Sequence, residues 1–513
     1  MIVKTYGSAV QGVAAITITL EVNVAPKGTK FYIVGLPDNA VKESQRRIES
    51  AIIDLGCKMP RLRTVVNMAP ADIKKAGSAY DLPIALGIIA ASKQMPADKL
   101  ADYIIMGELS LDGTLQPIKG ALPIAIQARK DGFKGLILPK QNAREAAMVN
   151  ELEVYGVSHM REVIHFFEQP QSLQPVIVDT RQEFLAAQAD FDVDFADVKG
   201  QYNIKRALEI AAAGGHNVIL IGPPGAGKTM LAKRFPTILP PLSLNEALET
   251  TKIHSVAGKL PAHTSLIARR PFRSPHHTVS DTALVGGGSI PQPGEISLAH
   301  NGVLFLDELP EFRRKVLEVM RQPIEERLVT ISRAKAIIDY PSNFLLLAAM
   351  NPCQCGFYNH SEKDCTCPPG AVQKYLNRVS GPLLDRIDLH VEVTPTPFSA
   401  LSSTEETEKS ESIRERVIKA REIQTARFAD HAGIYCNAQM NSHLLRTICT
   451  PDQEGATLLK KAMDFMKLSA RAYSRILKVS RTIADLEGSE QIQTPHLAEA
   501  IQFRSLDKEK WGG

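Results

Sequence analysis

A glycine-rich segment in the middle of the chain has the residue types that bind phosphate groups. It fits the pattern G-x-x-x-x-G-K followed by Ser or Thr, and it reads Gly222-Pro223-Pro224-Gly225-Ala226-Gly227-Lys228-Thr229. Glycines let backbone N–H groups wrap around phosphates, and a helix that begins at the lysine adds its partial positive charge. We therefore expect Lys228 to reach the β- and γ-phosphates of ATP and Thr229 to bind Mg²⁺. The alternative is a glycine-rich turn that binds no ligand.

Two acidic residues follow a later apolar run. Residues 303–306 predict a buried strand, and the strand ends in Asp307 and Glu308. Two carboxylates at the end of a buried strand are costly without a cation. We expect Asp307 to hold Mg²⁺ and Glu308 to polarise the water that attacks the γ-phosphate. Asn351, which follows the predicted strand 344–350, is the candidate polar residue between these acids and the γ-phosphate. Solvated acids at the end of an ordinary strand are the alternative.

Four of the seven cysteines lie in one short stretch, at Cys353, Cys355, Cys365 and Cys367. In a reducing compartment such a group indicates metal binding rather than disulfides. Four thiolates can hold one tetrahedral Zn²⁺ in a closed structural site, although spacers of one residue are shorter than usual. We expect zinc here, with reduced thiols that bind no metal as the alternative.

The chain that must position these groups has 513 residues, 44% of them hydrophobic, and a formal net charge of +4. Domains run to about 100–200 residues, so about three are expected in a soluble globular protein. No apolar run approaches the roughly 20 residues that span a bilayer, and the first residues do not resemble a signal peptide. We therefore expect a cytoplasmic protein that does not contact a membrane.

Hydrophobic patterns predict a multidomain α/β fold. Residues 1–170 mix alternating strands with helices and predict an α+β domain. The strands are expected at 16–24, 30–34 and 64–68, and the helices at 39–55 and 81–92. Residues 190–395 alternate apolar strands with helices, as a parallel sheet covered on both faces requires. Residues 412–505 are helical throughout. Polar or proline-containing linkers are expected at 168–175 and 395–412, and the strands expected in the central sheet are 217–221, 302–306 and 344–349.

Several longer segments carry a family resemblance. They are residues 34–39 (VGLPDN), 72–83 (DIKKAGSAYDLP), 273–277 (RSPHH), 293–300 (PGEISLAH), 380–388 (SGPLLDRID) and 469–473 (SARAY). With the motifs above, the chain resembles the magnesium-chelatase-like AAA+ proteins over nearly its full length, and more closely the bacterial ComM/YifB group. The resemblance implies an AAA+ ATPase core with a helical lid, assembled as a hexameric ring. For the ComM members it implies a DNA helicase that drives branch migration on single-stranded or branched DNA.

The resemblance also assigns two arginines. Arg386 matches the arginine finger that meets the γ-phosphate of the neighbouring subunit, and Arg471 matches the sensor-2 arginine of the lid. A guanidinium can bind the charge that develops on the transferring phosphoryl group. A salt bridge from Arg386 to Asp385 or Asp388 is the alternative, and Arg378 is then the substitute finger.

Two insertions in the core carry basic residues. The first, residues 269–299, contains glycines at 286–288 and the basic residues Arg269, Arg270, Arg273, His276 and His277. The second, residues 327–337, alternates like a hairpin and carries Arg333 and Lys335. Both lie where related proteins place pore loops. We therefore expect their basic side chains to line a ring pore and to contact the backbone phosphates of a DNA strand, irrespective of its base sequence. Solvated basic loops are the alternative.

The first domain resembles the Lon-protease-like fold. Ser78 lies near the position of the protease serine, but Ala121 occupies the position expected for its lysine. A serine without its base is a poor nucleophile, so we expect a platform for binding and assembly. The leading function is an ATP-dependent DNA translocase. A metal-chelatase ATPase subunit and a Lon-like ATP-dependent protease are the alternatives.

Overall fold

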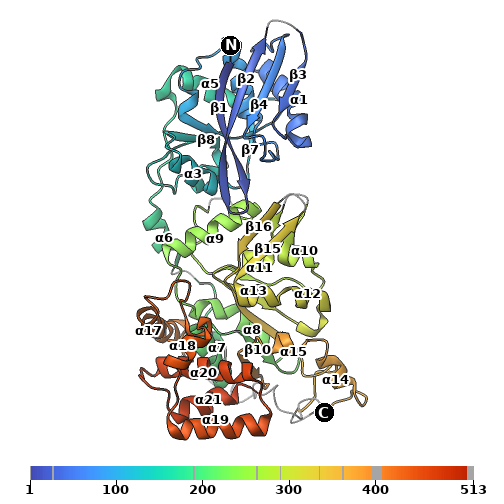
Figure 1. Ribbon diagram of the computed structural model, residues 1–513, viewed down its shortest axis with the longest axis vertical. Helices are drawn as coiled ribbons and strands as arrows, with labels where there is room; N and C mark the ends of the chain where they lie inside the picture. The colour runs from blue at the N-terminus through green and yellow to red at the C-terminus, as the bar shows by residue number, and fades with distance from the viewer. Residues whose placement is uncertain are drawn as a thin grey trace.

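The computed structural model of the protein describes residues 2–25, 28–188, 191–261, 264–288, 291–333, 336–360, 363–395 and 407–504. Figure 1 shows three parts along the long axis, with a mixed sheet at the N-terminal end, a parallel sheet in the middle and helices at the C-terminal end. A mixed α/β chain with a parallel-sheet core and a helical C-terminal region is therefore confirmed. Within the described residues, no helix is long and apolar enough to cross a membrane.

The N-terminal part is built on a seven-stranded sheet with the order β3-β4-β2-β1-β5-β8-β9. Its longest strands, β1 and β2, pair antiparallel from Ile2 opposite Asn23 to Gln11 opposite Ala14. The elements are β1 (Ile2–Gln11), β2 (Ala14–Ala25), β3 (Phe31–Val34), α1 (Asn39–Asp54), β4 (Arg63–Ala69), α2 (Asp81–Ala91), η1 (Leu100–Asp102), β5 (Tyr103–Ile105), β6 (Glu108–Leu109), β7 (Leu115–Gln116), α3 (Ala121–Lys130), β8 (Gly135–Pro139), α4 (Lys140–Ala146), β9 (Glu153–Val157), α5 (Met160–Glu168), η2 (Pro170–Ser172) and α6 (Thr180–Gln188).

Local sequence explains the elements of this part that were expected. Along β2 the buried residues recur at every second position, from Ile18 to Val24, because alternate side chains face the core. Helix α1 begins where the Asp38 carboxylate accepts a hydrogen bond from Val41 N. The strands expected at 16–24, 30–34 and 64–68 correspond to β2, β3 and β4, and the helices expected at 39–55 and 81–92 correspond to α1 and α2.

The middle part is a sheet of five parallel strands with the order β11-β14-β17-β10-β18. In such sheets, ligands bind at the carboxyl ends of the strands. The elements are η3 (Phe195–Asp197), α7 (Tyr202–Gly214), β10 (Val218–Ile221), α8 (Lys228–Arg234), η4 (Phe235–Ile238), α9 (Leu244–Ala257), β11 (Phe272–Arg273), α10 (Asp281–Val285), β12 (Gly286–Gly287), β13 (Gln292–Pro293), α11 (Glu295–Leu298), β14 (Val303–Leu306), η5 (Leu309–Glu311), α12 (Arg314–Val319), α13 (Arg321–Glu326), β15 (Leu328–Arg333), β16 (Ala336–Pro341), β17 (Leu345–Met350), α14 (Ala371–Leu376), α15 (Gly381–Leu384) and β18 (Leu389–Glu392).

The central strands are apolar without interruption because each face of the sheet borders a different core. Strands β10, β14 and β17 are buried along their whole length, and they correspond to the three expected strands. Alternate residues divide between the faces. Val218 and Phe305 pack with the C-terminal helices, whereas Ile219 and Leu304 pack with the hairpin β15–β16.

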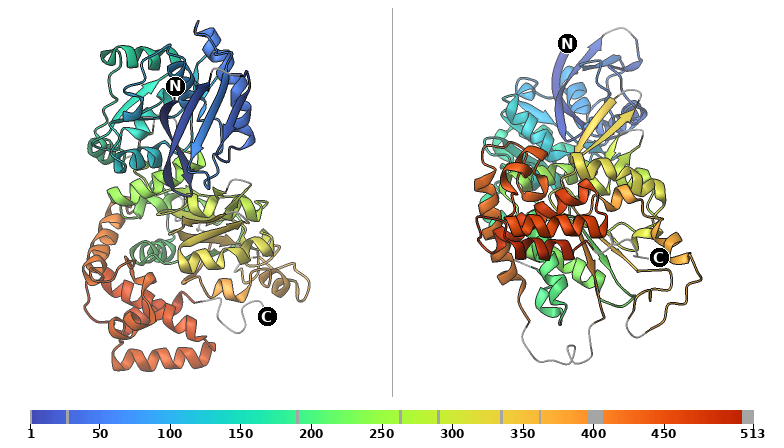
Figure 2. Two further views of the ribbon diagram at one scale, coloured as in Figure 1. Left: turned by 45° about the horizontal axis from the view of Figure 1, so that its top comes forward. Right: turned by 60° about the horizontal axis from the view of Figure 1, so that its bottom comes forward.

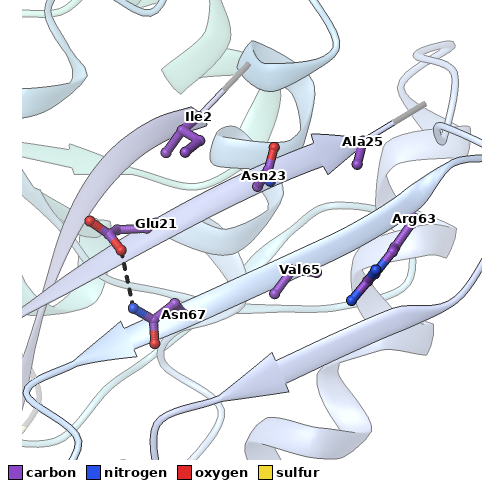
Figure 3. Close-up of a pocket in the computed structure, with 7 residues that line it drawn as sticks. All are labelled: Ile2, Glu21, Asn23, Ala25, Arg63, Val65 and Asn67. Atoms are coloured by element: carbon purple, nitrogen blue, oxygen red, sulfur yellow. Dashed lines mark hydrogen bonds between the residues drawn. The ribbon is translucent and has the colours of Figure 1, made fainter. Parts of the chain in front are cut away.

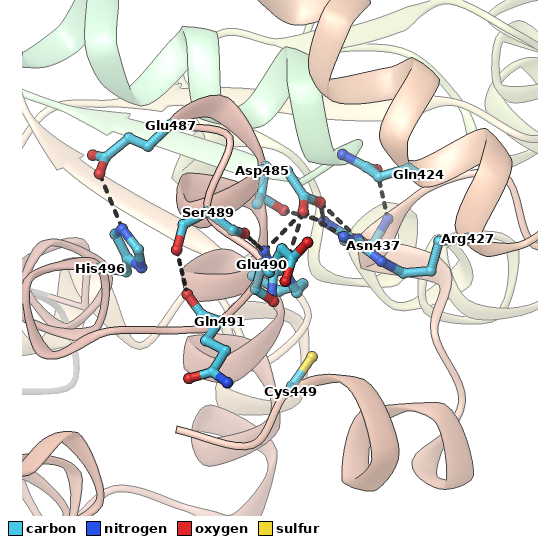
Figure 4. Close-up of polar contacts among 12 residues, drawn as sticks. Gln424, Arg427, Asn437, Cys449, Asp485, Glu487, Ser489, Glu490, Gln491 and His496 are labelled. Carbon is cyan, nitrogen blue, oxygen red and sulfur yellow. Dashed lines mark hydrogen bonds and ion pairs between the residues drawn. The ribbon is translucent and has the colours of Figure 1, made fainter. Parts of the chain in front are cut away.

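The C-terminal helices form one core with the sheet. Helix α17 starts at Ser410, slightly before the expected boundary at 412, and α17 and α20 both pack on α7. Figure 2 shows these helices beside the middle part. Inside them the Asp485 carboxylate accepts from Arg427 at 2.8 Å and from Asn437 at 2.7 Å (Figure 4). The elements are α17 (Ser410–Arg427), η6 (Asn437–Gln439), α18 (Ser442–Ile448), α19 (Gln453–Met466), α20 (Ala470–Leu486) and α21 (Thr494–Gln502).

The N-terminal part rests on the middle part through several contacts, two of which show how the parts meet. Gly120, at the start of α3, donates its N–H to the carbonyl of Ser255 in α9 at 3.1 Å. The turn between β1 and β2 meets the hairpin β15–β16, where a Cβ on Gly12 would lie 3.1 Å from Ile338 Cγ2. The N-terminal part therefore touches both helix α9 and the hairpin β15–β16 of the middle part.

Candidate nucleotide site and cysteine cluster

The phosphate-binding loop connects β10 to α8, as its motif requires. Gly225 and Gly227 have φ of +79° and +86°, in the left-handed region that favours glycine. Gly222 has no room for a side chain, because a Cβ there would lie 2.3 Å from the carbonyl oxygen of Val393. Backbone geometry thus favours or requires glycine at three positions of the motif.

Lys228 joins this loop to the end of β17. Its Nζ donates to the carbonyls of Gly222 and Pro223 at 2.6 and 2.9 Å, and to Asn351 Oδ1 at 3.1 Å. Burial lowers the pKa of Lys228, while the charge of Asp307 acts in the opposite direction. The lysine and Asn351 therefore lie together, as expected for two groups that contact one γ-phosphate.

Thr229 and Asp307 meet directly, with Thr229 Oγ1 donating to Asp307 Oδ2 at 2.7 Å. The other oxygen of Asp307 accepts from Glu308 N at 2.9 Å. A hydroxyl and a carboxylate are the oxygen ligands that Mg²⁺ takes beside a nucleotide, so the donor set fits that ion. Glu308 has φ of +53°, an uncommon backbone conformation for a residue other than glycine, and one that often occurs at functional sites.

A histidine that was expected in a basic loop lies beside this glutamate. His277 Nδ1 is 3.3 Å from Glu308 Oε2. The signal was available in principle, because His277 closely follows β11 and the carboxyl ends of neighbouring parallel strands meet at one edge of a sheet. It was missed because a strand of two residues is not detectable from hydrophobic alternation.

Arg270 and Arg273, which were expected as basic residues of a pore loop, are paired with carboxylates of the same chain. Arg270 donates to the carbonyl of Asn301 at 2.7 Å and pairs with Glu246 at 3.4 Å. Arg273 makes a bidentate pair with Glu295 at 2.6 and 2.9 Å. These guanidinium groups are held by partners in the same chain because the fold brings carboxylates to them, which the local sequence does not reveal.

The second insertion is a hairpin, as expected. Strands β15 and β16 pair antiparallel, from Leu328 opposite Pro341 to Arg333 opposite Ala336, and they lie between β14 and β17 in the chain. The Arg333 side chain and Lys335 lie outside the described residues, so their role as contacts to a DNA strand stays a prediction.

The two arginines considered as the arginine finger, Arg386 and Arg378, differ in burial and in their ion-pair partners. Arg386 is 6% exposed, and it pairs with Glu325 at 2.8 Å rather than with either neighbouring aspartate. The Arg378 side chain is 47% exposed and pairs with Glu311 at 2.8 Å. Arg378 is therefore the more accessible of the two in a single chain.

Arg471 lies close to the same segment. Its guanidinium is 3.7 Å from the carboxylate of Asp385, the residue before Arg386. Asp388 is bound instead by Arg475 at 2.7 Å, which fixes helix α20 to the end of the sheet. Arg471 therefore lies beside the segment that carries Arg386, although the two arginines come from different parts of the chain.

The four cysteines of the cluster come together directly after β17. Cys353 Sγ lies 3.2 Å from Cys355 Sγ and 3.8 Å from Cys365 Sγ, and all four sulfurs, with that of Cys367, lie within 4.8 Å of one another. Four sulfurs at about 2.3 Å from a tetrahedral Zn²⁺ would be about 3.8 Å apart. The cluster therefore fits a metal ion with four thiolate ligands.

Two places in the N-terminal part concern the expectation about Ser78 and Ala121 and the surface of the sheet. The Ser78 hydroxyl donates to the carboxylate of Glu108, and Ala121 is buried at the start of α3. A shallow hollow on the open face of the sheet is lined mainly by β2 and β4, where Asn67 donates to Glu21 at 3.1 Å (Figure 3). A role of this part as a platform for binding and assembly stays a prediction.

Comparison with known proteins identifies the family to which this nucleotide site belongs. Residues 194–401 match the family described as magnesium chelatase, subunit ChlI; residues 20–142 match subunit ChlI of Mg-chelatase, and residues 407–504 match its C-terminal part. The chain is 45% identical to competence protein ComM of Haemophilus influenzae over 503 residues, 98% of this chain and 97% of that protein. It is also 45% identical to YifB of Escherichia coli over 502 residues, 98% and 96% of the two chains.

A shorter similarity concerns Lon protease 2 of Bacillus subtilis, which is 34% identical over 154 residues, 27% of this chain and 26% of the protease. This agrees broadly with the expected Lon-like fold. The two full-length relatives and the three family matches are decisive for the chain as a whole. The chain belongs to the ComM/YifB group of the magnesium-chelatase-like AAA+ ATPases.

Proposed function

We propose that this protein is an ATP-dependent DNA translocase of the cytoplasm, which drives branch migration in recombination or natural transformation. It acts on single-stranded or branched DNA as a ring of identical subunits, six in the arrangement that the family suggests. The relative in Haemophilus influenzae is named a competence protein, which supports a role in DNA uptake or its consequences.

ATP hydrolysis would use the groups around the loop between β10 and α8. Lys228 and Asn351 would bind the γ-phosphate, and Thr229 and Asp307 would hold Mg²⁺, which would supply positive charge beside the phosphates. Glu308 orients and polarises the attacking water. The 2.7 Å contact between Thr229 and Asp307 supports this assignment, because both oxygens already point to one place.

The observation that carries the proposal is the position of the hairpin β15–β16. It lies in the chain between β14, which ends at Asp307 and Glu308, and β17, which ends before Asn351. A DNA strand that pulls on the hairpin therefore acts between β14 and β17, the two elements whose ends are proposed to face the γ-phosphate. Basic side chains at its tip would bind phosphates irrespective of base sequence.

A ring is supported by the arginines. Arg471 pairs with Asp385, the residue before Arg386, and a neighbouring subunit would bring its γ-phosphate to this surface. The finger then supplies positive charge in trans. To do so, Arg386 must exchange its partner Glu325 for the phosphate.

The test is ATP hydrolysis with and without single-stranded DNA, together with displacement of a labelled strand from a branched duplex. We expect DNA to raise the rate several-fold and displacement to require ATP. Parallel assays with protoporphyrin plus Mg²⁺ and with an unfolded protein test the chelatase and protease alternatives. Stimulation by porphyrin alone, or ATP-dependent proteolysis without a response to DNA, would refute the proposal.

A further inference from the structure

The N-terminal sheet carries large apolar side chains on a face that remains accessible. Successive residues of a strand point to opposite faces of the sheet. On the inner face, Val22 packs on helix α2, where a Cβ on Gly87 would lie 2.6 Å from Val22 Cγ2. On the outer face, Ile2, Tyr32 and Val34 are 63%, 41% and 45% exposed. Apolar side chains that gather on an accessible surface indicate a binding site.

Strand pairing arranges the outer side chains in two rows across β1, β2, β4 and β3. Residues that lie opposite each other in the register are on the same side of the sheet. The first row is Ile2, Asn23, Val65 and Tyr32, and the second is Lys4, Glu21, Asn67 and Val34. Figure 3 shows the part of these rows around the shallow hollow. The open face, defined by these two rows, thus places a mainly apolar row beside a mainly polar one.

One side of the open face combines an aromatic ring with a guanidinium group. Tyr32 lies on the edge strand β3, and Arg63 is the first residue of the neighbouring strand β4. Arg63 Cζ is 5.5 Å from the centroid of the Tyr32 ring, a distance at which the cation is attracted to the ring. Proteins that bind single strands stack bases on aromatic rings and on guanidinium planes. The pair therefore offers two planar groups to a nucleobase.

The charge of these strands favours a polyanion. Strands β1 to β4, with residues 28–30 and 61–62 that lead into β3 and β4, contain the basic residues Lys4, Lys30, Arg61 and Arg63 and the acidic residue Glu21. Glu21 already has partners, because Lys4 lies 3.5 Å away and Asn67 donates to it at 3.1 Å. In the whole chain, 60 Lys and Arg are nearly balanced by 56 Asp and Glu. The basic excess is therefore local, as expected for a surface that contacts phosphates.

We propose that the open face is a second binding site for single-stranded DNA, separate from the hairpin β15–β16. The choice of DNA as the strand rests on the proposed function. A base stacks on Tyr32 or Arg63, and the amides of Asn23 and Asn67 are donors and acceptors for base edges. The basic side chains around β3 and β4 contact the backbone phosphates, irrespective of base sequence.

The open face is joined to the hairpin by the two longest strands of the sheet. Strands β1 and β2 run from the open face to the turn at Gly12, where a Cβ would lie 3.1 Å from Ile338 in β16. From Lys4 to Gly12 the extended chain covers about 26 Å, at about 3.3 Å per residue. A strand of several nucleotides can therefore contact the open face while the same DNA passes the hairpin.

The experiment measures binding of a labelled oligothymidine to the full-length parent protein and to four variants. Tyr32→Ala should raise the dissociation constant about five- to tenfold, because one base loses its stacking partner. Tyr32→Phe keeps the ring and should bind like the parent. Arg63→Ala should also weaken binding and reduce its salt dependence by about one charge. The control is Arg161→Ala, which removes an exposed arginine of α5, beside the edge strand β9 at the other end of the sheet, and should change neither quantity.

A blunt-ended DNA duplex is the second ligand, because its bases are already stacked on one another. Tyr32→Ala should leave the affinity for the duplex, the basal ATPase rate and the melting temperature unchanged, since the Tyr32 side chain is accessible and far from the nucleotide loop in the chain. An unchanged affinity for oligothymidine in both Tyr32→Ala and Arg63→Ala overturns the proposal, as does an equal loss of duplex binding in Tyr32→Ala. Variants that no longer assemble into the parent's oligomer also overturn it, because the open face then binds a second copy of the chain.

Strand displacement and DNA-stimulated ATP hydrolysis by the parent protein separate this proposal from the proposed function. If the parent binds oligothymidine through Tyr32 and Arg63 but shows neither activity, the binding site stands and the translocase fails. If the parent shows both activities and the variants bind oligothymidine as tightly as the parent, the translocase stands and the open-face site fails. A parent protein that binds no oligothymidine contradicts both.

Discussion

Gly356 of the cysteine loop packs directly against Pro224 of the phosphate-binding loop. A Cβ on Gly356 would lie 2.6 Å from Pro224 Cδ, which is closer than real side-chain contacts. Gly356 also has φ of +88°, in the left-handed region. The cysteine cluster therefore supports the loop that binds the nucleotide, and a change in one should be measurable in the other.

Replacing Gly356 by alanine should weaken ATP binding without loss of metal, because the new Cβ would displace Pro224. We expect the dissociation constant for ATP to rise by up to about tenfold, corresponding to about 1.4 kcal/mol. The control is Gly370→Ala, since Gly370 has a similar φ of +76° but open space around it. Equal ATP affinities for the two variants would show that the contact has no effect on the nucleotide site.

The cluster should hold about one zinc ion per chain, at Zn–S distances of about 2.3 Å. Elemental analysis and X-ray absorption of the purified protein measure both quantities. Replacing Cys353 and Cys365 together by serine should remove the metal and lower the melting temperature, whereas Cys57→Ser, in the N-terminal part, should change neither. Protein prepared anaerobically that contains no metal would contradict the assignment.

Lys228→Ala and Glu308→Gln should separate ATP binding from hydrolysis. The first removes a cation that contacts the phosphates, so it should abolish measurable binding. The second removes only the group that polarises water, so binding should persist while the rate falls by about a hundredfold or more. Lys233→Ala, on the exposed side of α8, is the matched control for Lys228. Hydrolysis at the parent rate by Glu308→Gln would exclude its catalytic role.

Arg386 should act on the nucleotide of a neighbouring subunit. Arg386→Ala and Lys228→Ala proteins should each be inactive, and mixing them should restore part of the ATPase activity, because some interfaces then pair an intact loop with an intact finger. The same mixing with Arg378→Ala identifies the finger if Arg386 stays bound to Glu325. If only the Arg378→Ala variant recovers ATPase activity in mixed rings, Arg378 is the finger instead of Arg386.

The tip of the hairpin β15–β16 should bind the DNA backbone. Replacing Arg333 and Lys335 together by alanine should weaken single-strand binding for every sequence and reduce its salt dependence by up to about two charges. Basal ATP hydrolysis should survive, while DNA stimulation and strand displacement fall together. Binding measured across a salt series tests this, and an unchanged slope with intact displacement would place the strand elsewhere.

The nucleotide loop and the acidic pair could be predicted from the sequence because their chemistry is local. A phosphate-binding turn needs glycines, a lysine and a hydroxyl on consecutive residues, and a buried strand shows itself by continuous apolar residues. The four cysteines were also recognisable, because their side chains are close along the chain. For such groups, residue type and spacing already imply most of the geometry.

The tertiary structure decided the contacts between residues that are distant in the sequence. Arg270 and Arg273 looked like free basic residues, but folding supplies Glu246 and Glu295 as their partners. His277 reaches Glu308 only because β11 and β14 lie side by side in a parallel sheet. Such pairings depend on strand order and on the return path of a loop, which leave no periodic signal in the sequence. They arise from packing of the whole chain.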